Sequence, residues 1–429
     1  MVGFSAAVVF MLAMMLGGVW VVVSIGAAGI VGLFNILGFE RVVVALGSIT
    51  WETNTNFVLV ALPLFVFMGE LLFQTGIMNR IYVSASKIVS GLPGGLLQTN
   101  IAACTLFAAC SGSSLASAAT IGSVGYPQIV PRGYDRPLAL GSIAAGGTLG
   151  ILIPPSIIFI IYGSMAEVSI GRLFMAGVLP GLLLATLYVL YIAARALLNP
   201  ALAPREPNVG WRDMLKAVGE LWQVILLAAV VLGGIYGGVA SPTEVAALGA
   251  VLALVFAAVA RTLTWRAVRA SALNTVRQTC MILFIIMAAK LFAMTLIYYQ
   301  IPNRMVGWIE MLGLSAMLLV VAVCLLYLAM GTFFDGVSMM VITIPFVVPM
   351  MLALQVDLIW LGVLVCIMIE IGLLTPPVGL NIYVLQGATG ESMRDIVVGS
   401  MPFVLCQVLT ALLVLFYPQL ALFLPSLLF

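Results

Sequence analysis

The 429-residue sequence contains no histidine, few charged residues and no paired cysteine motif. The absence of histidine removes the commonest general base and the commonest protein metal ligand. Only 7% of the residues are charged and the net charge is +2, spread over short loops, so nucleic acid is not an expected partner. The six cysteines lie in apolar segments without a CxxC pair, which indicates neither disulfides nor a zinc site. We expect no cofactor, and we expect the cysteines to be small core side chains.

Apolar residues, in contrast, are abundant. They make up 64% of the chain, and apolar runs of about 20 residues, the length that crosses a bilayer, recur throughout it. This pattern predicts an all-α polytopic membrane protein and excludes a soluble enzyme. No cleavable signal peptide is expected, because the first apolar run leads directly into the second. Spans are expected near residues 4–23, 25–38, 55–74, 137–163, 171–197, 221–240, 243–262, 276–299, 358–386 and 400–424.

Two further apolar stretches are interrupted by polar segments that contain glycine. Residues 95–130 are broken at "CSGSS" and residues 316–353 at "GTFFDG". Each is too short for two crossings, so we expect re-entrant helical hairpins. The polar linker at 199–220 divides the chain roughly in half. The expected organisation is N-terminal scaffold helices in 1–54, a first repeat in 55–198, the linker and connecting scaffold helices in 199–262, and a second repeat in 263–429.

The basic residues predict the orientation of the chain in the membrane. With these spans, and with each hairpin returning to its own side, thirteen basic residues fall on one face and three on the other, while Lys290 lies inside a span. Cytoplasmic loops carry an excess of lysine and arginine. The thirteen-residue face is therefore predicted to be cytoplasmic, with both termini on the opposite side of the membrane.

Two Pro-Pro pairs interrupt apolar spans in matching positions. They lie in "LGILIPPSIIF" (149–159) and "IGLLTPPVGLN" (371–381), and proline breaks a helix because it lacks the N–H group and clashes with the preceding turn. "GIMNRI" (76–81) likewise resembles "QIPNRM" (300–305), at a nearly constant offset. We interpret this as an internal duplication, inverted because an odd number of crossings separates the copies. The alternative is that proline and glycine only kink tightly packed helices.

Inverted repeats with interrupted helices indicate a secondary-transporter binding site near the bilayer midplane. An unwound segment frees carbonyl groups that can coordinate a hard cation, and a half-helix N-terminus can face an anion. We expect each break to meet the hairpin tip of its own repeat, at residues 111–114 and 331–336. At the offset of 222 residues, Ser113 corresponds to Asp335.

Three segments carry a resemblance to a known family. "SGSSLASAATIGSVGYPQIVPRGYDRPLALGSIAAGGTLGILIPPS", the following "RLFMAGVLPGLLL" and "EIGLLTPPVGLNIYV" resemble the large, DctM-like membrane subunit of tripartite ATP-independent periplasmic (TRAP) transporters. The resemblance covers essentially the whole chain. It implies a sodium-driven importer of organic acids, such as dicarboxylates, in the bacterial inner membrane. It also implies an elevator mechanism, in which a transport domain that carries both hairpins slides against a scaffold. The implied partners are a small four-helix DctQ-like membrane subunit and a periplasmic DctP-like binding protein.

On this basis one sodium site is expected in each repeat, and the delivered carboxylate is expected between the hairpin tips. Ser114 is the first choice for the carboxylate, because it should open the second hairpin helix. The alternative is that these serines only cap the hairpin. Candidate sodium-binding residues are Ser113, Gly150, Pro154, Gly331, Asp335, Gly372 and Thr375. Candidate substrate-binding residues are Ser111, Ser114, Ser156 and Asn381.

Four ionisable residues lie within or beside apolar spans, where each charge costs at least ~2.5 kcal/mol. Asp335 and Glu370 are assigned to the cation site of the second repeat, with a protonated structural acid as the alternative. A structural hydrogen bond is expected for Glu70, and Lys290 departs from the small or apolar residue that the family resemblance leads us to expect. Other functions left open are a stand-alone sodium/dicarboxylate symporter and a channel. An integral membrane enzyme has no support from a nucleophile–base pair or a metal cluster.

Overall fold

Helices make up nearly all of the chain in the computed structural model, which describes residues 2–204, 206 and 209–428. These residues form 21 α-helices and three short 3-10 helices, without a strand among them, so the predicted all-α class is confirmed. Arg205, one of the thirteen basic residues assigned to the cytoplasmic face, lies outside the described residues, as do Met1 and Phe429.

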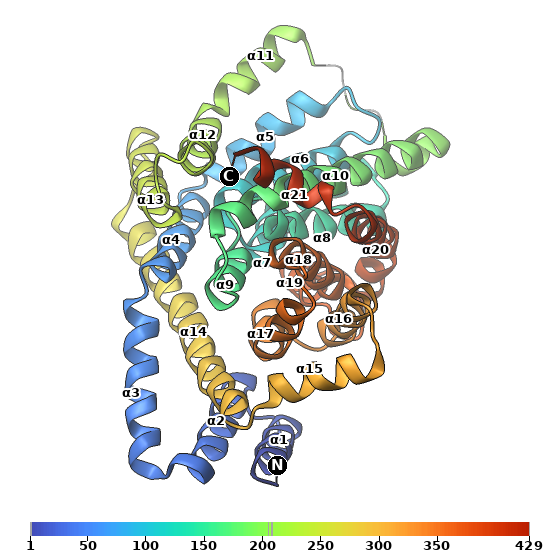
Figure 1. Cartoon of the computed structure of the whole chain (residues 1–429). Helices are drawn as coiled ribbons and strands as arrows, with labels where there is room; N and C mark the ends of the chain where they lie inside the picture. Colours follow the sequence, from blue (N-terminus) through green and yellow to red (C-terminus); the bar gives the residue numbers. More distant parts are fainter. Residues whose placement is uncertain (1, 205, 207–208, 429) are drawn as a thin grey trace.

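Three N-terminal helices precede the first repeat, where the sequence predicted only two (Figure 1). The prediction was wrong in its boundaries, because Gly17 and Gly18 end the first helix early, with Gly18 at a φ of 79°. A third helix with mixed polar and apolar residues was missed, and it begins after Gly38 at a φ of 76°. The bounds are α1 (Val2–Leu16), α2 (Val21–Leu37) and α3 (Phe39–Thr55).

The first repeat consists of a span, a short amphipathic helix, a two-helix hairpin, a broken helix and a long helix. The hairpin predicted at 95–130 is present, with its break at Gly112, and the predicted span at 137–163 is interrupted at its Pro-Pro pair. The bounds are η1 (Phe57–Val60), α4 (Ala61–Gln74), α5 (Ile77–Val89), α6 (Leu96–Ser111), α7 (Ser114–Ile129), η2 (Val130–Arg132), α8 (Arg136–Leu152), α9 (Ile157–Met165) and α10 (Ile170–Leu198).

The second repeat follows the same order of elements. "QIPNRM" opens α15 as "GIMNRI" opens α5, and the hairpin predicted at 316–353 and the break at the second Pro-Pro pair are both present. The last predicted span, 400–424, was placed too far along the chain, because α20 begins at Met393 and ends before Pro418, and a separate helix follows. The bounds are α14 (Trp265–Tyr298), α15 (Ile301–Leu312), α16 (Ala316–Gly331), α17 (Gly336–Ala353), α18 (Leu358–Leu374), α19 (Leu380–Thr389), α20 (Met393–Phe416) and α21 (Gln419–Leu428).

The polar linker and two apolar helices connect the repeats, as η3 (Pro200–Leu202), α11 (Trp211–Glu220), α12 (Trp222–Tyr236) and α13 (Pro242–Val259). The linker is held against the base of the first hairpin. The Tyr134 hydroxyl donates to a Glu206 carboxylate oxygen at 2.8 Å, and Arg132 lies 3.6 Å from the same oxygen. Burial, the largest effect, raises the pKa of Tyr134 above its ordinary value.

Glycines bring the buried helices into close contact. Helix α8 is buried from Leu138 to Leu152 and packs along α20. A Cβ on Gly399 would lie only 1.7 Å from the Pro137 carbonyl oxygen, and one on Gly141 would lie 2.0 Å from the Gly399 carbonyl oxygen. Small residues at such crossings let helix backbones approach closely, which is the usual basis of helix packing in membranes.

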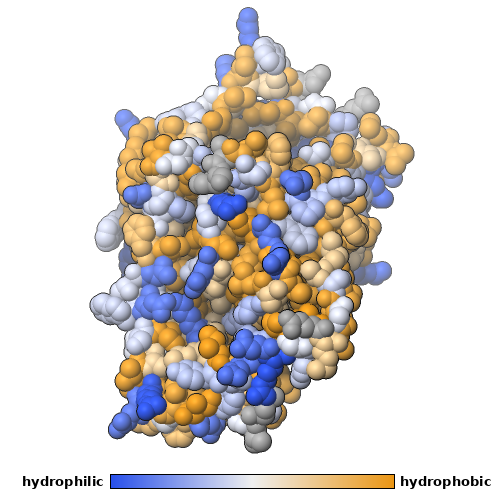
Figure 2. All heavy atoms as spheres, in the orientation of Figure 1, coloured by the Kyte–Doolittle hydropathy of each residue, from blue (hydrophilic) through white to orange (hydrophobic). Residues whose placement is uncertain are grey.

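The outer surface is strongly apolar. Among the described residues, seven helices are long and apolar enough to cross a membrane, and up to eight if the bent pair α11 and α12 counts as one span. This is fewer than the ten predicted, because several expected spans are shorter helices. Figure 2 shows apolar residues over much of one face, with hydrophilic residues scattered among them. This surface suits contact with lipid rather than water.

Candidate transport site at the hairpin tips

Each hairpin tip is hydrogen-bonded to the broken helix of its own repeat. In the first repeat, the backbone N–H of Ile157 donates to the Gly112 carbonyl at 3.3 Å. In the second, the N–H of Val378 donates to the Thr332 carbonyl at 3.0 Å. In both cases the donor follows the Pro-Pro pair and the acceptor lies in the polar interruption of the hairpin. The juxtaposition expected from the sequence is therefore present in both repeats.

The first tip is built around Ser113. Its side chain caps α7 by accepting from the Ala116 N–H at 3.4 Å, and its carbonyl accepts from the Ser117 hydroxyl at 2.8 Å. A Cβ on Gly150 would lie 3.0 Å from that carbonyl oxygen, so the glycine lets α8 approach the tip. Pro154 lies in the buried break that follows. Backbone carbonyls and serine hydroxyls thus gather at one place.

The second tip has the same arrangement, but its helix-capping residue is the charged Asp335. The Asp335 carboxylate accepts from the backbone N–H groups of Val337 and Ser338, at 3.1 Å each. A Cβ on Gly372 would lie 2.5 Å from the Gly331 Cα, so the hairpin and α18 are in backbone contact there. At the end of α18 the Thr375 hydroxyl donates to the Ile371 carbonyl at 2.6 Å, which leaves its lone pairs as acceptors.

Both tips face one cavity of about 180 Å³. The first hairpin contributes Ser113 and Ser114, and the second contributes Asp335 and the start of α17. The remaining walls come from residues on either side of the two breaks and from α14. The lining residues include Gly112, Leu115, Ile157, Ile158, Gln278, Met281, Ile282, Gly336, Val337 and Leu380. Segments of both repeats therefore meet at a single site beside a helix outside the hairpins.

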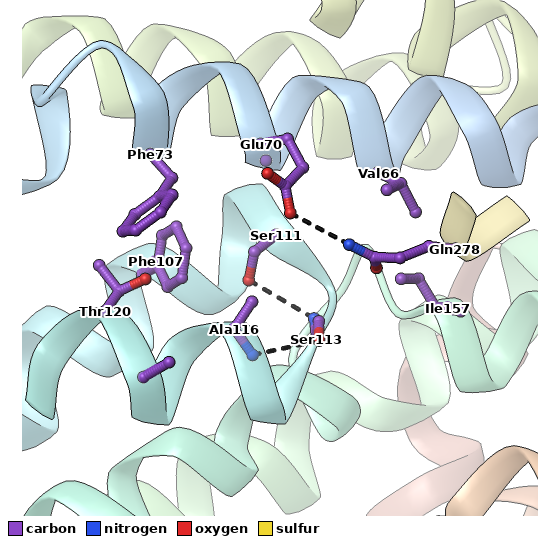
Figure 3. A pocket seen from close by; sticks show the side chains of 12 residues that line it. Val66, Glu70, Phe73, Phe107, Ser111, Ser113, Ala116, Thr120, Ile157 and Gln278 are labelled. Atoms are coloured by element: carbon purple, nitrogen blue, oxygen red, sulfur yellow. Dashed lines mark hydrogen bonds between the residues drawn. The ribbon is translucent and has the colours of Figure 1, made fainter. Parts of the chain in front are cut away.

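A second cavity, of about 170 Å³, also borders the first tip (Figure 3). It shares Ser113, Ile157 and Gln278 with the first cavity. Its wall opposite the tip carries Glu70 of α4. The Glu70 carboxylate accepts from the Asn274 amide at 2.9 Å and from the Gln278 amide at 3.0 Å, which confirms the structural hydrogen bond expected for this residue.

The candidate substrate residues are only partly brought together. Ser111 and Ser114 line the cavities. Ser156 lines neither of them; it is fully buried, and its side chain caps α9 by accepting from the Phe159 N–H at 3.3 Å. Asn381 is also absent from both linings; its side chain is fully buried and has no hydrogen-bond partner among the described residues.

The two remaining ionisable residues of the apolar spans have different surroundings. The Lys290 ammonium lies 2.7 Å from a Glu52 carboxylate oxygen, so the unexpected lysine of α14 pairs with α3. Glu370 is fully buried in α18, and neither carboxyl oxygen has a partner among the described residues. It does not line the cavity between the tips.

Sequence reasoning missed Gln278, which lines both cavities. The sequence contains one relevant signal, because the amide side chains of Asn274 and Gln278 lie one helical turn apart. The charge and hydropathy of this segment do not point to it. The common partner of the two amides, Glu70, lies more than 200 residues earlier, so the cluster could not be recognised from local pattern.

These features define the class of protein: a membrane transport protein built from two copies of a hairpin and a broken helix, rather than an enzyme. The family model described as "Tripartite ATP-independent periplasmic transporter, DctM component" matches residues 8–420. The chain belongs to this family of TRAP transporter large permease subunits, which work with a small membrane subunit and a periplasmic binding protein.

Two curated relatives and one solved structure illustrate the similarity. The C4-dicarboxylate TRAP transporter large permease protein DctM of Pseudomonas aeruginosa is 36% identical over 406 residues, 93% of each chain. The isethionate TRAP transporter permease protein DctMQ of Oleidesulfovibrio alaskensis, a fusion, is 31% identical over 88% of this chain and 59% of its own. The YdaH transporter of Alcanivorax borkumensis has a similar fold, with a TM-score of 0.62, 18% identity and 89% of each chain covered.

Proposed function

We propose that this chain is the translocating subunit of a sodium-coupled importer of small organic acids that receives its cargo from a periplasmic binding protein. The observation that carries the proposal is the convergence of both hairpin tips on one cavity, each tip bonded to the break of its own repeat. The bacterial inner membrane is the proposed location, with both termini on the periplasmic side.

The anion is proposed to bind at the first tip. The first residues of α7, Ser114 and Leu115, line the cavity, and a helix N-terminus favours an anion by roughly 0.3–2 kcal/mol. The N-cap residue of α7 is Ser113, so the hydroxyl of the following Ser114 does not cap the helix. No arginine or lysine lines the described part of this cavity, so neutral donors would hold the carboxylate weakly enough for release.

Sodium is proposed to bind at the unwound backbone of each repeat. Hard cations prefer oxygen ligands. The carbonyls near Gly150 and Pro154, with Ser113, would serve in the first repeat. Those near Gly331 and Gly372, with Thr375, would serve in the second, where the Asp335 carboxylate adds negative charge.

The movement is proposed to be that of an elevator. The two hairpins and two broken helices form the moving part, and the helices in 1–54, α4, α12, α13 and α14 form the scaffold. The apolar wall that α14 presents to the cavity supports this division, because such a surface can slide without breaking many hydrogen bonds.

Relatives support the substrate class without naming the acid. The names of two relatives specify a C4-dicarboxylate in one case and isethionate in the other, and both substrates are small anions. We extend only the common feature, a small organic acid, to this chain.

Reconstitution tests the proposal. Liposomes that contain this chain and its small membrane subunit should take up the acid delivered by the binding protein when sodium is higher outside. Uptake should stop when the sodium gradient is collapsed or the binding protein is omitted. Uptake that is unchanged without the binding protein would favour a stand-alone symporter, and uptake unchanged without sodium would contradict sodium coupling.

A further inference from the structure

The cavity beside the first hairpin tip has a carboxylate on the wall opposite the proposed anion site. In Figure 3 the Glu70 side chain extends from α4 toward the tip that carries Ser111 and Ser113. Two amides of α14, from Asn274 and Gln278, fix it by hydrogen bonds of 2.9 and 3.0 Å. The carboxylate is therefore held in a defined position that faces the cavity.

This carboxylate has no cationic side chain to neutralise it. Among the described residues, no lysine or arginine nitrogen lies within 4.0 Å of its oxygens, whereas Lys290 and Arg132 are each paired with another glutamate. A carboxylate can accept about four hydrogen bonds, so the two amides leave acceptor positions free. An anionic group placed opposite an anion site needs a cation to balance it.

The other walls of the cavity favour an organic cation over a bare metal ion. Phe73 and Phe107 both line the cavity, and Val66, Ala116 and Ile157 add apolar surface (Figure 3). Aromatic faces attract ammonium groups, and apolar walls accept the carbon atoms that such groups carry. Oxygen-bearing side chains also line the cavity, at Glu70, Ser111, Ser113, Thr120 and Gln278, so a changed sodium requirement is the outcome that would indicate a metal ion instead.

We infer that Glu70 forms a subsite for the protonated nitrogen of the cargo, so that the preferred substrate is a small zwitterionic or amino acid rather than a plain dicarboxylate. The inference rests on the proposed function, because the cargo's carboxylate is taken to lie at the Ser113–Ser114 tip. The two cavities share Ser113, Ile157 and Gln278 in their linings, so the two subsites are neighbours at the first tip. A dianion would meet the like charge of Glu70 and be disfavoured.

The test is ligand-induced thermal stabilisation of the purified membrane complex at saturating sodium, which avoids the selectivity of the binding protein. The probes are matched pairs: succinate with aspartate, and butyrate with 4-aminobutyrate. Glu70→Gln removes the charge and keeps one of the two acceptor oxygens, and its unfolding midpoint without ligand checks that the fold is retained. Glu40→Gln, an exposed carboxylate in the first turn of α3, is the matched control.

In the parent and in Glu40→Gln, aspartate and 4-aminobutyrate should each stabilise the complex at a concentration about tenfold lower than succinate and butyrate, respectively. In Glu70→Gln this difference should disappear, while butyrate changes less than twofold and succinate stabilises at a lower concentration than in the parent. Equal or better stabilisation of the parent by the plain acids would overturn the inference and leave the proposed function standing. A rise in the sodium requirement of Glu70→Gln without a change in cargo preference would also overturn it. Failure of every acid to bind or to be taken up would contradict the proposed function as well.

Discussion

Ser113 and Asp335 occupy the same position in the two hairpins and do the same local job. Each caps the second hairpin helix through its side-chain oxygen, and they lie 222 residues apart. Only Asp335 carries a charge, which is stabilised by the helix N-terminus that it caps. If both tips contribute to cation sites, the second repeat provides the stronger attraction, so the two sites are expected to differ in sodium affinity.

The hydroxyl of Thr375 can be removed with little change in shape. Thr375→Val should raise the sodium concentration for half-maximal uptake about tenfold, because one oxygen ligand worth about 1 to 1.5 kcal/mol is lost. The matched control is Thr186→Val, which loses the same type of bond to a carbonyl four residues earlier, at an exposed site of α10. An unchanged sodium requirement would remove Thr375 from the proposed site.

Ser114 tests the location of the carboxylate. Ser114→Ala should raise the half-saturation for the delivered acid about tenfold or more at saturating sodium, because one hydrogen bond to a charged group contributes about 1.5–3 kcal/mol. Ser123→Ala, further along α7, should behave like the parent. If the maximal rate and the half-saturation of Ser114→Ala both match the parent, the carboxylate binds elsewhere.

The contact between α16 and α18 determines how the second hairpin docks. The Cα atoms of Gly331 and Gly372 face each other so closely that a Cβ on Gly372 would lie 2.5 Å from the Gly331 Cα. Gly372→Ala should destabilise the protein by about 1–3 kcal/mol, because backbone must move to admit the methyl group. Its thermal unfolding midpoint should fall by several degrees.

A matched glycine on the neighbouring helix provides the control. A Cβ on Gly387 of α19 would meet nothing within 4 Å, so Gly387→Ala should leave the midpoint unchanged or raise it slightly. Equal midpoints for Gly372→Ala and the parent would show that the contact at Gly331 is dispensable.

The hairpins and breaks were predictable because their signals are local. Glycine and polar residues inside apolar runs, and Pro-Pro inside a span, act on the backbone within a few residues. Helix α3 was missed because charged residues such as Glu40 and Glu52 interrupt its apolar pattern. The amphipathic helices α5, α11 and α15 were not predicted as separate elements for the same reason.

The site was predictable only in part, because it depends on contacts distant in sequence. The tips and breaks were identified by the repeat, but the role of Ser156 as a helix cap and the cluster of Glu70 with Gln278 depend on packing between different segments. Likewise, nothing local indicates that Lys290 pairs with Glu52, which lies 238 residues earlier.

At the scale of the whole molecule, the excess of basic residues on one face predicts the orientation. Single cysteines at Lys216 in α11 and at Ser426 in α21, in a background that lacks the six native cysteines, should react with a membrane-impermeant reagent from opposite sides. The cytoplasmic side should label position 216. Labelling of both positions from one side would contradict the orientation and the inverted relation of the repeats.

The measurement that tests the central claim most directly is the ratio of radioactive sodium to labelled acid that enters liposomes containing the complete transporter. Because both repeats present a tip bonded to a broken helix, the account predicts at least two sodium ions for each acid, and a lower ratio in Thr375→Val. Acid entry without any accompanying sodium would contradict the claim that the two hairpin tips form a sodium-coupled transport site.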